Sequence, residues 1–521
     1  MRRSAAIAFL VALSSTPVGA QATKLRARDS ATVCPATTPA CVPPAARREF
    51  RGVWVATARN VDWPSKPRLS TTQQQDEFLA ILDRAAQTGF NAVIFQVRPE
   101  GDAFYQSDLE PWSEYLTGRQ GRAPLPFWDP LAFAVKEAHA RGMELHAWFN
   151  PYRAKEPNMK GPLASWSFAK RNPALVKTYG KHLWMDPGEA TVRAHTLAVV
   201  LDVVRRYDID GVHLDDYFYP YPEKNRNGST EFPDNASWRT YQKSGGTLAR
   251  NVWRRENVNT LVRQLHEEVG KAKPWVKFGI APFGLWKPGS PENACCFDAF
   301  EKLFADSRTW LVNGWVDYFV PQLYWAMDRE NLRYPDLLTW WAAQNEQNRH
   351  LWPGNYTSKV GEPGNSAWKR GEVLSQIAAT RAEPAASGNV HFSIEVFLND
   401  RDSIATALER TTYAERSLVP ASPWLGRTVP PTPTLRVAAD SSGVDVVTIR
   451  LPAGEPRENI RWWLVQQQIG GRWESTVLDG ALNEFDVQLL LRNAFVRAEL
   501  LSVVAIDRVG NAGKPAVLRL P

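Results

Sequence analysis

The feature that most limits the fold of this chain is a repeated order of amphipathic helix, turn and short apolar strand. Ser70 precedes a helix expected over residues 71–88, Gly89 ends it, and residues 91–98 form an apolar strand. The same order recurs until eight strands are reached. Strands that alternate with helices form a parallel sheet. The pattern therefore predicts an α/β fold, a (β/α)8 TIM barrel with enlarged loops, over residues 49–422.

The main alternative to a barrel is a doubly wound parallel sheet. A nucleotide-binding sheet of that kind has a Gly-rich turn after its first strand. Residues 57–60 follow the first expected strand here and read Thr-Ala-Arg-Asn, without glycine. The barrel is therefore the favoured fold.

The segments outside the barrel differ from it in composition. Residues 1–22 have a basic start, an apolar run and an Ala-x-Ala cleavage site, which predicts a signal peptide. Residues 23–48 are rich in Ala, Pro and Thr and are expected to form a flexible leader. Residues 423–434 form a Pro-rich linker. Short β runs over residues 435–521 predict a small β-sandwich of immunoglobulin or fibronectin type III size.

The signal peptide predicts where the protein is located, and the distribution of its charged residues indicates which partners it does not bind. An export signal predicts a periplasmic or extracellular protein, and its apolar run is too short to span a bilayer. The net charge is +7, but the basic residues are scattered and form no run of the kind that binds nucleic acid. We therefore expect neither a membrane-spanning protein nor a nucleic-acid partner.

The four cysteines fall into two close pairs. Cys34 and Cys41 could close a small loop in an oxidising compartment. Cys295 and Cys296 are adjacent, so a vicinal disulfide, two free thiols and cross-pairing all remain open. Neither pair has the spacing of a zinc site.

The stretch 207–220 carries the strongest chemical signal. It begins as a short apolar strand and ends in Asp215 and Asp216, followed by a cluster of aromatic residues. Because a strand alternates its faces, His213 and Asp215 share one face and the apolar residues share the other. Carboxylates at the carboxyl end of a barrel strand lie where such barrels keep their active sites.

The carboxyl ends of the other strands add a common set of polar and aromatic residues. Planar rings cover the faces of sugars, and amides and Arg bind hydroxyl groups, so the set suits a polyhydroxylated ligand. Many of the 22 Trp are expected to be core residues instead. The residues expected to bind substrate are Gln96, Arg98, His146, Trp148, Asn150, Tyr152, His213, Tyr217, Gln322, Tyr324 and Trp325.

Cleavage of a glycosidic bond needs two carboxyl groups. Asp215 is the first candidate for the nucleophile or ionised stabiliser, and Asp216, Asp102 and Glu395 are the candidates for the acid. Neighbours on a strand point apart, so the pair is expected to lie across the mouth of the barrel. Residues 281–284, at the end of the fifth strand, offer no acid.

Two other functions remain open at this point. His213 and His146, with Asp215 or Asp216, could hold a divalent ion for hydrolysis or deacetylation, although no His-x-x-x-His motif supports it. The missing acid of the fifth strand also allows a non-catalytic barrel that only binds glycan. The expectation is an enzyme without metal or cofactor.

Ten segments between residues 49 and 400 resemble, in order, the glycosyl hydrolase-like 10 family. They include EFRGVWV (49–55), HAWFNPYR (146–153), DGVHLDDYFYPYP (210–222), KFGIAPFG (277–284) and PQLYW (321–325). The others are 60–65, 96–99, 101–103, 111–113 and 253–259. The resemblance implies a barrel of glycosidase type in an exported bacterial protein, followed by a fibronectin-like tail. It also implies action on peptidoglycan glycan strands, as in a divisome-associated relative, and leaves cell-envelope protein partners open for the C-terminal domain.

Residues 210–215 also resemble the fourth-strand motif of the α-amylase superfamily. In that motif Arg stands at the position of His213 and the Asp equivalent to Asp215 is the nucleophile, which supports that role here. The chain departs from the motif set at its fifth strand, where amylases keep their acid. The family's second-strand motif has a small residue at the position of Glu100, which favours Asp102 over Glu100.

Overall fold

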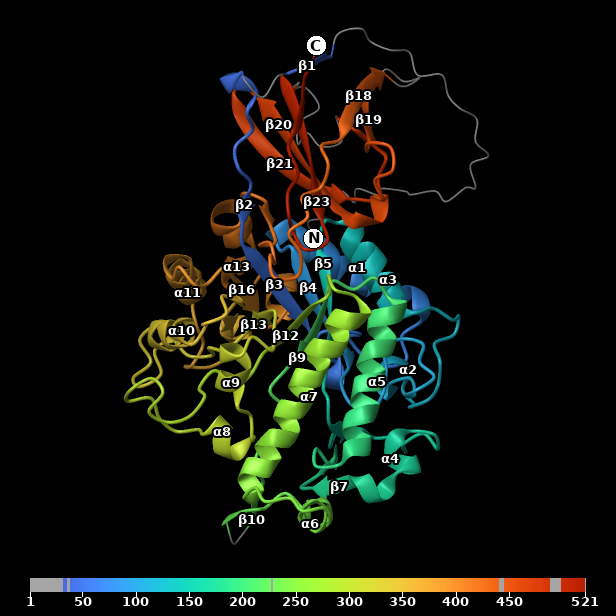
Figure 1. The fold of residues 1–521 in the computed structure, drawn as a ribbon, viewed down its shortest axis with the longest axis vertical. Coiled ribbons are helices and arrows are strands. Elements are labelled where there is room, and N and C mark those ends of the chain that lie inside the picture. The colour runs from blue at the N-terminus through green and yellow to red at the C-terminus, as the bar shows by residue number, and fades with distance from the viewer. Residues whose placement is uncertain (1–30, 35–37, 226–227, 440–444, 488–497, 521) are drawn as a thin grey trace, which may run out of the picture.

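The computed structural model describes residues 31–34, 38–225, 228–439, 445–487 and 498–520, and the signal peptide expected over residues 1–22 lies outside them. The chain has an α/β part and a C-terminal all-β part, and the all-β part occupies one end of the long axis (Figure 1). Within the described ranges, no helix combines the length and apolar character needed to cross a membrane.

A parallel sheet of nine strands forms the centre of the α/β part. Its order is β14-β13-β12-β9-β5-β4-β3-β16-β15, and all pairs are parallel. The strands are β3 (Phe50–Val55), β4 (Ala92–Arg98), β5 (Glu144–Phe149), β9 (Gly211–Leu214), β12 (Lys277–Ile280), β13 (Tyr318–Phe319), β14 (His350–Leu351), β15 (Gly354–Asn355) and β16 (Gly388–His391).

The helices between these strands begin and end largely where the sequence predicts. Ser70 and Gln73 form a capping box at the start of α1, and Gly89 ends it with a φ of 98° that suits glycine. The longer helices are α1 (Thr71–Thr88), α3 (Pro130–Ala140), α5 (Ala190–Arg206), α6 (Asn235–Lys243), α7 (Arg250–Ala272), α9 (Ser307–Val312), α10 (Tyr334–Ala343) and α11 (Arg370–Ala382). The short ones are α2 (Glu114–Thr117), α4 (Phe168–Arg171), α8 (Ala299–Lys302), α12 (Glu395–Leu398) and α13 (Ile404–Ala407).

Two predicted elements differ from the structure. The sequence pattern predicts one helix over residues 298–312, but the structure divides it into α8 and α9, with Phe304 between them at a φ of 51°, outside the helical region. The pattern also predicts a strand over residues 390–397, but the strand ends at His391 and Glu395 begins α12.

The loop after β5 contains a small antiparallel sheet that sequence periodicity does not reveal. Its order is β6-β8-β7, and the strands are β6 (Arg153–Lys155), β7 (Val176–Tyr179) and β8 (His182–Met185). The loop after β9 adds a hairpin of β10 (Lys224–Asn225) and β11 (Gly228–Ser229). Both insertions follow the carboxyl ends of their strands.

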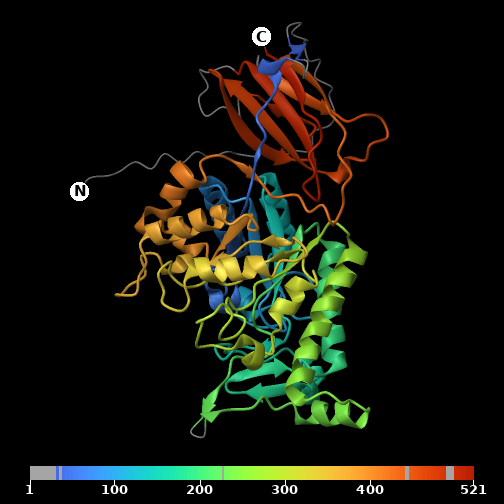
Figure 2. The ribbon, with the colours of Figure 1, turned by 60° about the vertical axis from the view of Figure 1, so that its left-hand side comes forward.

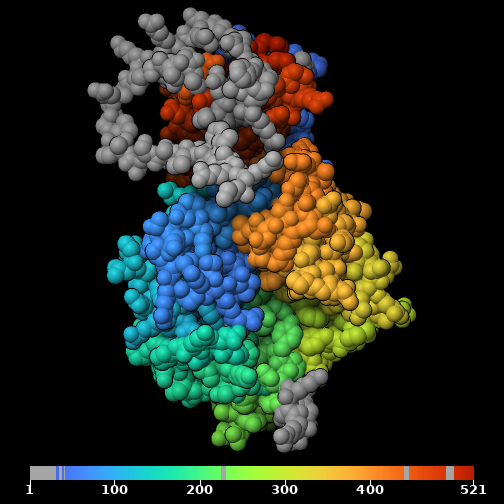
Figure 3. Space-filling view, turned by 180° about the vertical axis from the view of Figure 1, so that it is seen from behind, coloured from blue at the N-terminus to red at the C-terminus, as the bar shows by residue number. Residues whose placement is uncertain are grey.

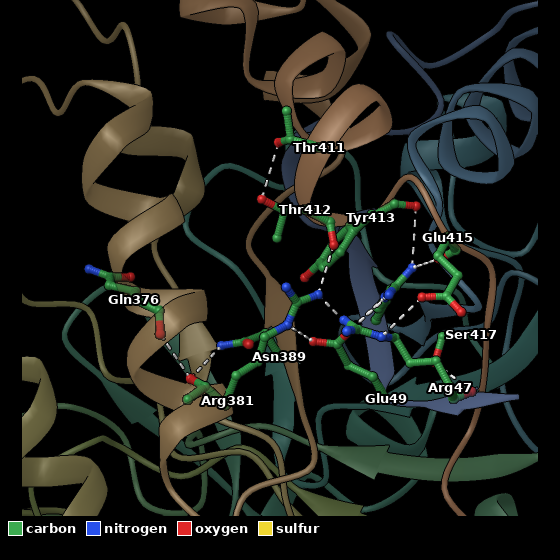
Figure 4. Close-up of polar contacts among 12 residues, drawn as sticks. Arg47, Glu49, Gln376, Arg381, Asn389, Thr411, Thr412, Tyr413, Glu415 and Ser417 are labelled. Atoms are coloured by element: carbon green, nitrogen blue, oxygen red, sulfur yellow. Dashed lines mark hydrogen bonds and ion pairs between the residues drawn. The ribbon is translucent and has the colours of Figure 1, made fainter. Parts of the chain in front are cut away.

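The start and the end of the α/β part are joined by a cluster of ionic contacts (Figure 4). The carboxylate of Glu49, just before β3, accepts from Arg381 of α11 at 2.7 and 2.9 Å and from Arg51 at 2.8 Å. Arg51 also donates to the carbonyl of Glu415 at 2.7 Å. The first and last segments, blue and orange in Figure 3, accordingly lie side by side.

The all-β part consists of two antiparallel sheets that enclose a core around Trp463, Val503 and Val447. The larger sheet has the order β1-β24-β23-β20-β21 and the smaller β18-β19-β22. The strands are β1 (Thr32–Val33), β18 (Thr434–Ala439), β19 (Asp445–Arg450), β20 (Ile460–Ile469), β21 (Arg472–Asp479), β22 (Glu484–Asp486), β23 (Leu500–Asp507) and β24 (Ala516–Arg519). Its assignment as a fibronectin type III domain stays a prediction.

Residues 31–34 and 38–48, within the expected flexible leader, make defined contacts. Strand β1 pairs with the edge strand β24, and a disulfide joins Cys34 to the buried Cys41. Further on, β2 (Arg47–Arg48) pairs with β17 (Ser417–Leu418). An unpaired sheet edge accepts any extended segment through its backbone, so a segment of low hydrophobicity can be ordered there. A second disulfide joins Cys295 to Cys296.

The all-β part contacts the α/β part at the amino ends of the parallel strands (Figure 2). Arg461 of β20 reaches Asp210, which precedes β9, with Nε 2.9 Å from Oδ1. Trp424 Nε1 donates to Asp317, which precedes β13, at 2.8 Å. The all-β part therefore lies on the face opposite the carboxyl ends of the strands.

We expect Arg461→Met to lower the free energy of unfolding by about 3 kcal/mol, because Asp210 would remain buried without its guanidinium partner. Burial alone would raise the pKa of Asp210, but Arg461 and His139 hold it well below its usual range. Arg508→Met is the matched control. It removes the ion pair between Arg508 and Asp208, whose side chain is 44% exposed, and exposed ion pairs contribute less than about 1 kcal/mol to stability. Denaturant unfolding measures both, and equal losses would contradict a buried interdomain ion pair.

Candidate active site

A cleft of about 380 Å³ lies at the carboxyl ends of the parallel strands. It combines three carboxyl groups with a wall of aromatic rings and two arginines. The lining residues are Trp54, Ala56, Ala58, Arg59, Val61, Gln96, Trp148, Arg153, Glu156, Asp215, Asp216, Tyr217, Tyr221, Ala281, Phe283, Gln322, Tyr324, Tyr356 and Phe392.

Asp215 is buried at the floor of this cleft and is held by N–H donors. Its Oδ2 accepts from Trp148 Nε1 at 3.1 Å and from Asn150 Nδ2 at 2.6 Å, and its Oδ1 accepts from the Tyr217 backbone at 3.3 Å. Burial and the charge of Asp216 together raise the pKa of Asp215 to about 7. Hydrogen bonds fix the carboxylate while burial disfavours its charge, a combination typical of catalytic carboxyl groups.

Asp216 faces the same cleft from the next position in the chain. Its Oδ1 accepts from Gln322 Nε2 at 3.2 Å, and its Oδ2 accepts from the Tyr221 hydroxyl. Burial raises the pKa of Asp216 as well. Neighbouring residues of a strand point to opposite faces, but β9 ends at Leu214. Asp215 and Asp216 lie beyond that end, so their side chains need not point apart.

A chain of amides orients the donors to Asp215. The backbone N–H groups of Thr57 and Ala58 donate to Gln96 Oε1 at 2.9 and 2.8 Å, and Gln96 Nε2 donates to Asn150 Oδ1 at 2.7 Å. Because Asn150 Oδ1 is held by Gln96, its Nδ2 faces Asp215. The predicted Gln96 and Asn150 thus act as one unit behind the carboxylate.

Arg98, His146 and His213 were expected to bind substrate, but they do not line the cleft. Arg98 is buried in an ion pair with Glu110 and donates to the Asn150 carbonyl. In a regular strand Gln96 and Arg98 would share one face, but the register shift between them breaks the alternation, so Arg98 does not follow Gln96 toward the cleft.

The two histidines lie beneath the cleft in the core of the sheet. His213 Nε2 accepts from Trp54 Nε1 at 3.1 Å, and its Nδ1 lies 3.2 Å from the Tyr318 hydroxyl. His146 bonds to Glu144 and to the same hydroxyl, at 2.9 Å each. Both nitrogens of each ring are therefore engaged, and over the described ranges no group of three metal-ligating side chains gathers.

Tyr152, Asp102 and Glu395 also lie outside the cleft lining. Tyr152 is fully buried in the core. Glu395, expected on a strand, begins α12, where it pairs with Arg401 and accepts from Asn399 at 2.7 Å. Asp102 is fully buried, and burial with the neighbouring Glu100 raises the pKa of Asp102 well above its usual range.

We expect Asp102→Asn to retain activity within about twofold, because this carboxyl group does not reach the cleft. The pKa of Asp102 is raised in the folded protein, so its charged form destabilises the fold once the pH exceeds the pKa that this carboxyl group has in the unfolded chain. The neutral variant should therefore melt at an equal or higher temperature at pH 7. Steady-state kinetics and a thermal melt measure the two effects. A hundredfold loss of activity would instead assign Asp102 to catalysis.

Several residues of the cleft were not expected from the sequence. Glu156 and Arg153 belong to the inserted loop after β5 and pair with Nε 3.1 Å from Oε1. The Arg153 guanidinium lies 4.2 Å from the centroid of Tyr217. Arg153 closes the HAWFNPYR segment, which is the one sequence signal that could have pointed to it. Of the remaining predicted binders, Tyr217, Gln322 and Tyr324 line the cleft, and Trp325 lines an adjoining hollow.

Comparison with known proteins gives the family. The model of the family described as Glycosyl hydrolase-like 10 matches residues 49–369. The chain belongs to the glycosyl hydrolase-like 10 family. Glycosyl hydrolase YngK of Bacillus subtilis is 36% identical over 479 residues, which cover 90% of this chain and 92% of YngK. Glycosyl hydrolase DigH of Escherichia coli is 35% identical over 391 residues, 68% of this chain and 86% of DigH.

Family membership and these relatives identify the chain as a glycoside hydrolase, so its substrate is a glycan. Among solved structures, the glycoside hydrolase domain of PgaB (BpsB) from Bordetella bronchiseptica aligns with a TM-score of 0.47 at 13% identity. That alignment covers 70% of this chain and 98% of the PgaB domain.

Proposed function

We propose that this glycoside hydrolase cleaves bonds within the glycan strands of the bacterial cell wall, using Asp215 and Asp216 as its two carboxyl groups. One observation carries the assignment: both side chains are buried, and both face one aromatic-lined cleft at the carboxyl ends of the strands. Of the three acids expected as partners of Asp215, Asp216 alone lines that cleft.

The hydrogen bonds support a separate role for each carboxyl group. The raised pKa values of Asp215 and Asp216 mean that the pair holds a proton close to neutral pH. The three groups that contact Asp215 are N–H donors, which favour its ionised form. The Tyr221 hydroxyl beside Asp216 can donate or accept. We therefore assign the proton that the pair shares to Asp216 and the negative charge to Asp215.

This arrangement performs the two tasks of glycosidic cleavage. Asp216 gives its proton to the glycosidic oxygen as the bond to the anomeric carbon breaks, so that the leaving sugar departs as an alcohol. The Asp215 carboxylate meets the positive charge that develops at the anomeric carbon, as nucleophile or as ionised stabiliser. Water then forms a bond to that carbon and gives up a proton, which returns to Asp216.

The rest of the cleft fits a sugar chain. Trp54, Trp148 and Tyr217 present rings that can cover sugar faces, and Gln322 offers an amide beside the acid. The net charge of +7 favours an anionic polymer such as a cell-wall strand. A signal peptide over residues 1–22 would deliver the enzyme to that polymer, in the periplasm or outside the cell.

Two finer structural proposals accompany the function. Residues 350–355 bond to strands on both sides, with Trp352 N donating to Phe319 O at 2.9 Å and Val390 N donating to Pro353 O at 3.1 Å. These bonds support a sheet that closes as an eight-fold barrel, with β14 and β15 as parts of one strand. The two antiparallel sheets after residue 434 support a fibronectin type III-like domain that contacts envelope proteins, away from the cleft.

The substrate assignment can be tested with a panel of glycans. We expect the full-length enzyme to release soluble oligosaccharides from sacculi treated with an amidase, and little from neutral polysaccharides of similar length. Mass spectrometry of the soluble fraction identifies the sugar units. Release from a neutral polysaccharide alone would contradict a cell-wall substrate while keeping the glycosidase.

A further inference from the structure

A second hollow of about 470 Å³ adjoins the catalytic cleft. The two share Tyr324 and Tyr356, whose rings stack with centroids 5.1 Å apart and planes at 25°. A chain that passes Asp215 and continues over this pair of rings enters the second hollow. The hollow therefore occupies the place of a neighbouring sugar subsite.

The second hollow differs from the cleft in charge. It is lined by Tyr324, Trp325, Ala326, Arg329, Tyr356, Lys359 and Trp368, a set with two cations and no acid. Lys359 Nζ lies 5.0 Å from the centroid of Trp368. In the part of the chain that the structure describes, no carboxylate forms an ion pair with Lys359 or Arg329. The cleft, in contrast, carries three carboxyl groups.

The backbone holds the cationic side of the hollow in place. Lys359 ends the 3-10 helix Thr357–Lys359, and its carbonyl accepts from Trp368 N at 2.9 Å. On the other side, Gln376 Nε2 donates to the Trp325 carbonyl at 3.2 Å. Cations that lie beside aromatic rings and have no carboxylate of their own suit an anion from a ligand.

We propose that this hollow binds a sugar unit that carries a carboxylate. The rings of Trp325 and Trp368 would cover the apolar face of the sugar, and Lys359 and Arg329 would bind its carboxylate. The inference rests on the proposed function, because the chain that occupies the cleft is the one that reaches this hollow. It adds the chemical class of the unit next to the cleavage site.

Chemical removal of the carboxylates tests this subsite. Amidase-treated strands expose carboxylates, which carbodiimide activation and borohydride reduction convert to neutral hydroxymethyl groups. Binding is measured by tryptophan fluorescence with the full-length Asp215→Asn protein, so that cleavage does not interfere. We expect Lys359→Met in this background to raise the Kd for carboxylate strands about tenfold and to leave the Kd for reduced strands unchanged. Arg329→Met should act in the same direction.

Lys287 provides a matched control. Its Nζ lies 4.4 Å from the centroid of Trp286, and neither residue lines the cleft or the hollow. Lys287→Met should change neither Kd. Equal weakening on both strands by Lys359→Met, or no effect at all, would overturn the subsite. Failure of the proposed function has a different signature, because wild-type protein would then release no product from strands that it still binds in a carboxylate-dependent way.

Discussion

Asp215→Asn is expected to lower kcat/KM on glycan strands by at least about a thousandfold. The substitution keeps the shape of the side chain but removes the charge that meets the anomeric carbon. The asparagine oxygen can still accept from Trp148 and Asn150, so the site should keep its geometry. Initial rates on amidase-treated strands measure the loss.

Stability separates a chemical effect from a structural one in this variant. Burial and the neighbouring carboxyl group raise the pKa at Asp215 to about 7, above the ordinary value of 3.8, so the second negative charge of the Asp215–Asp216 pair destabilises the fold increasingly as pH rises from about 4 to 7. A neutral asparagine lacks this penalty and should melt at the same or a higher temperature at pH 8. A melting temperature lowered by many degrees would mean that the loss of activity reflects misfolding.

Asp216→Asn is expected to lower kcat on glycan strands by about a hundredfold to ten-thousandfold, because the leaving sugar oxygen loses its proton donor. An aryl glycoside of the released sugar unit needs no such proton and should lose far less. The wild-type rate should also fall as pH rises through about 7, where the pair loses its last proton, and this alkaline limb should be absent in the variant.

The contrast with Asp215→Asn makes the assignment of Asp216 specific. Loss of the nucleophile or stabiliser affects both substrates, whereas loss of the acid affects mainly the substrate with the poor leaving group. Paired kinetics on strands and on the aryl glycoside, each over pH 5–9, provide the comparison. Equal losses on the two substrates from Asp216→Asn would exclude it as the acid and direct attention to Glu156, the third carboxyl group of the cleft.

The sequence predicts the elements of this fold where local signals are strong. Helix α1 has the predicted bounds because Ser70 and Gly89 satisfy its terminal backbone groups. The predictions fail where tertiary contacts decide: β1 forms because the edge of β24 is free to pair with it, and α12 replaces the end of an apolar run that resembles a strand. The sheet inserted after β5 has no periodic signal at all.

The sequence predicts part of the candidate site, and the differences have two causes. Asp215, Asn150 and Gln96 were found because they follow or end recognisable strands. His213 lies within β9, one layer deeper than Asp215, which follows the end of that strand, and Trp54 donates to the His213 ring there. Sequence alternation gives the face of a side chain but not its depth. Glu156 was missed because a long loop folds back over the cleft, which no local pattern reveals.

The most direct test compares wild type, Asp215→Asn and Asp102→Asn on the same amidase-treated strands, with products identified by mass spectrometry. We expect oligosaccharides from wild type and from Asp102→Asn, and none from Asp215→Asn. That result would place catalysis at the carboxyl pair of the cleft. Products from Asp215→Asn at the wild-type rate would contradict it.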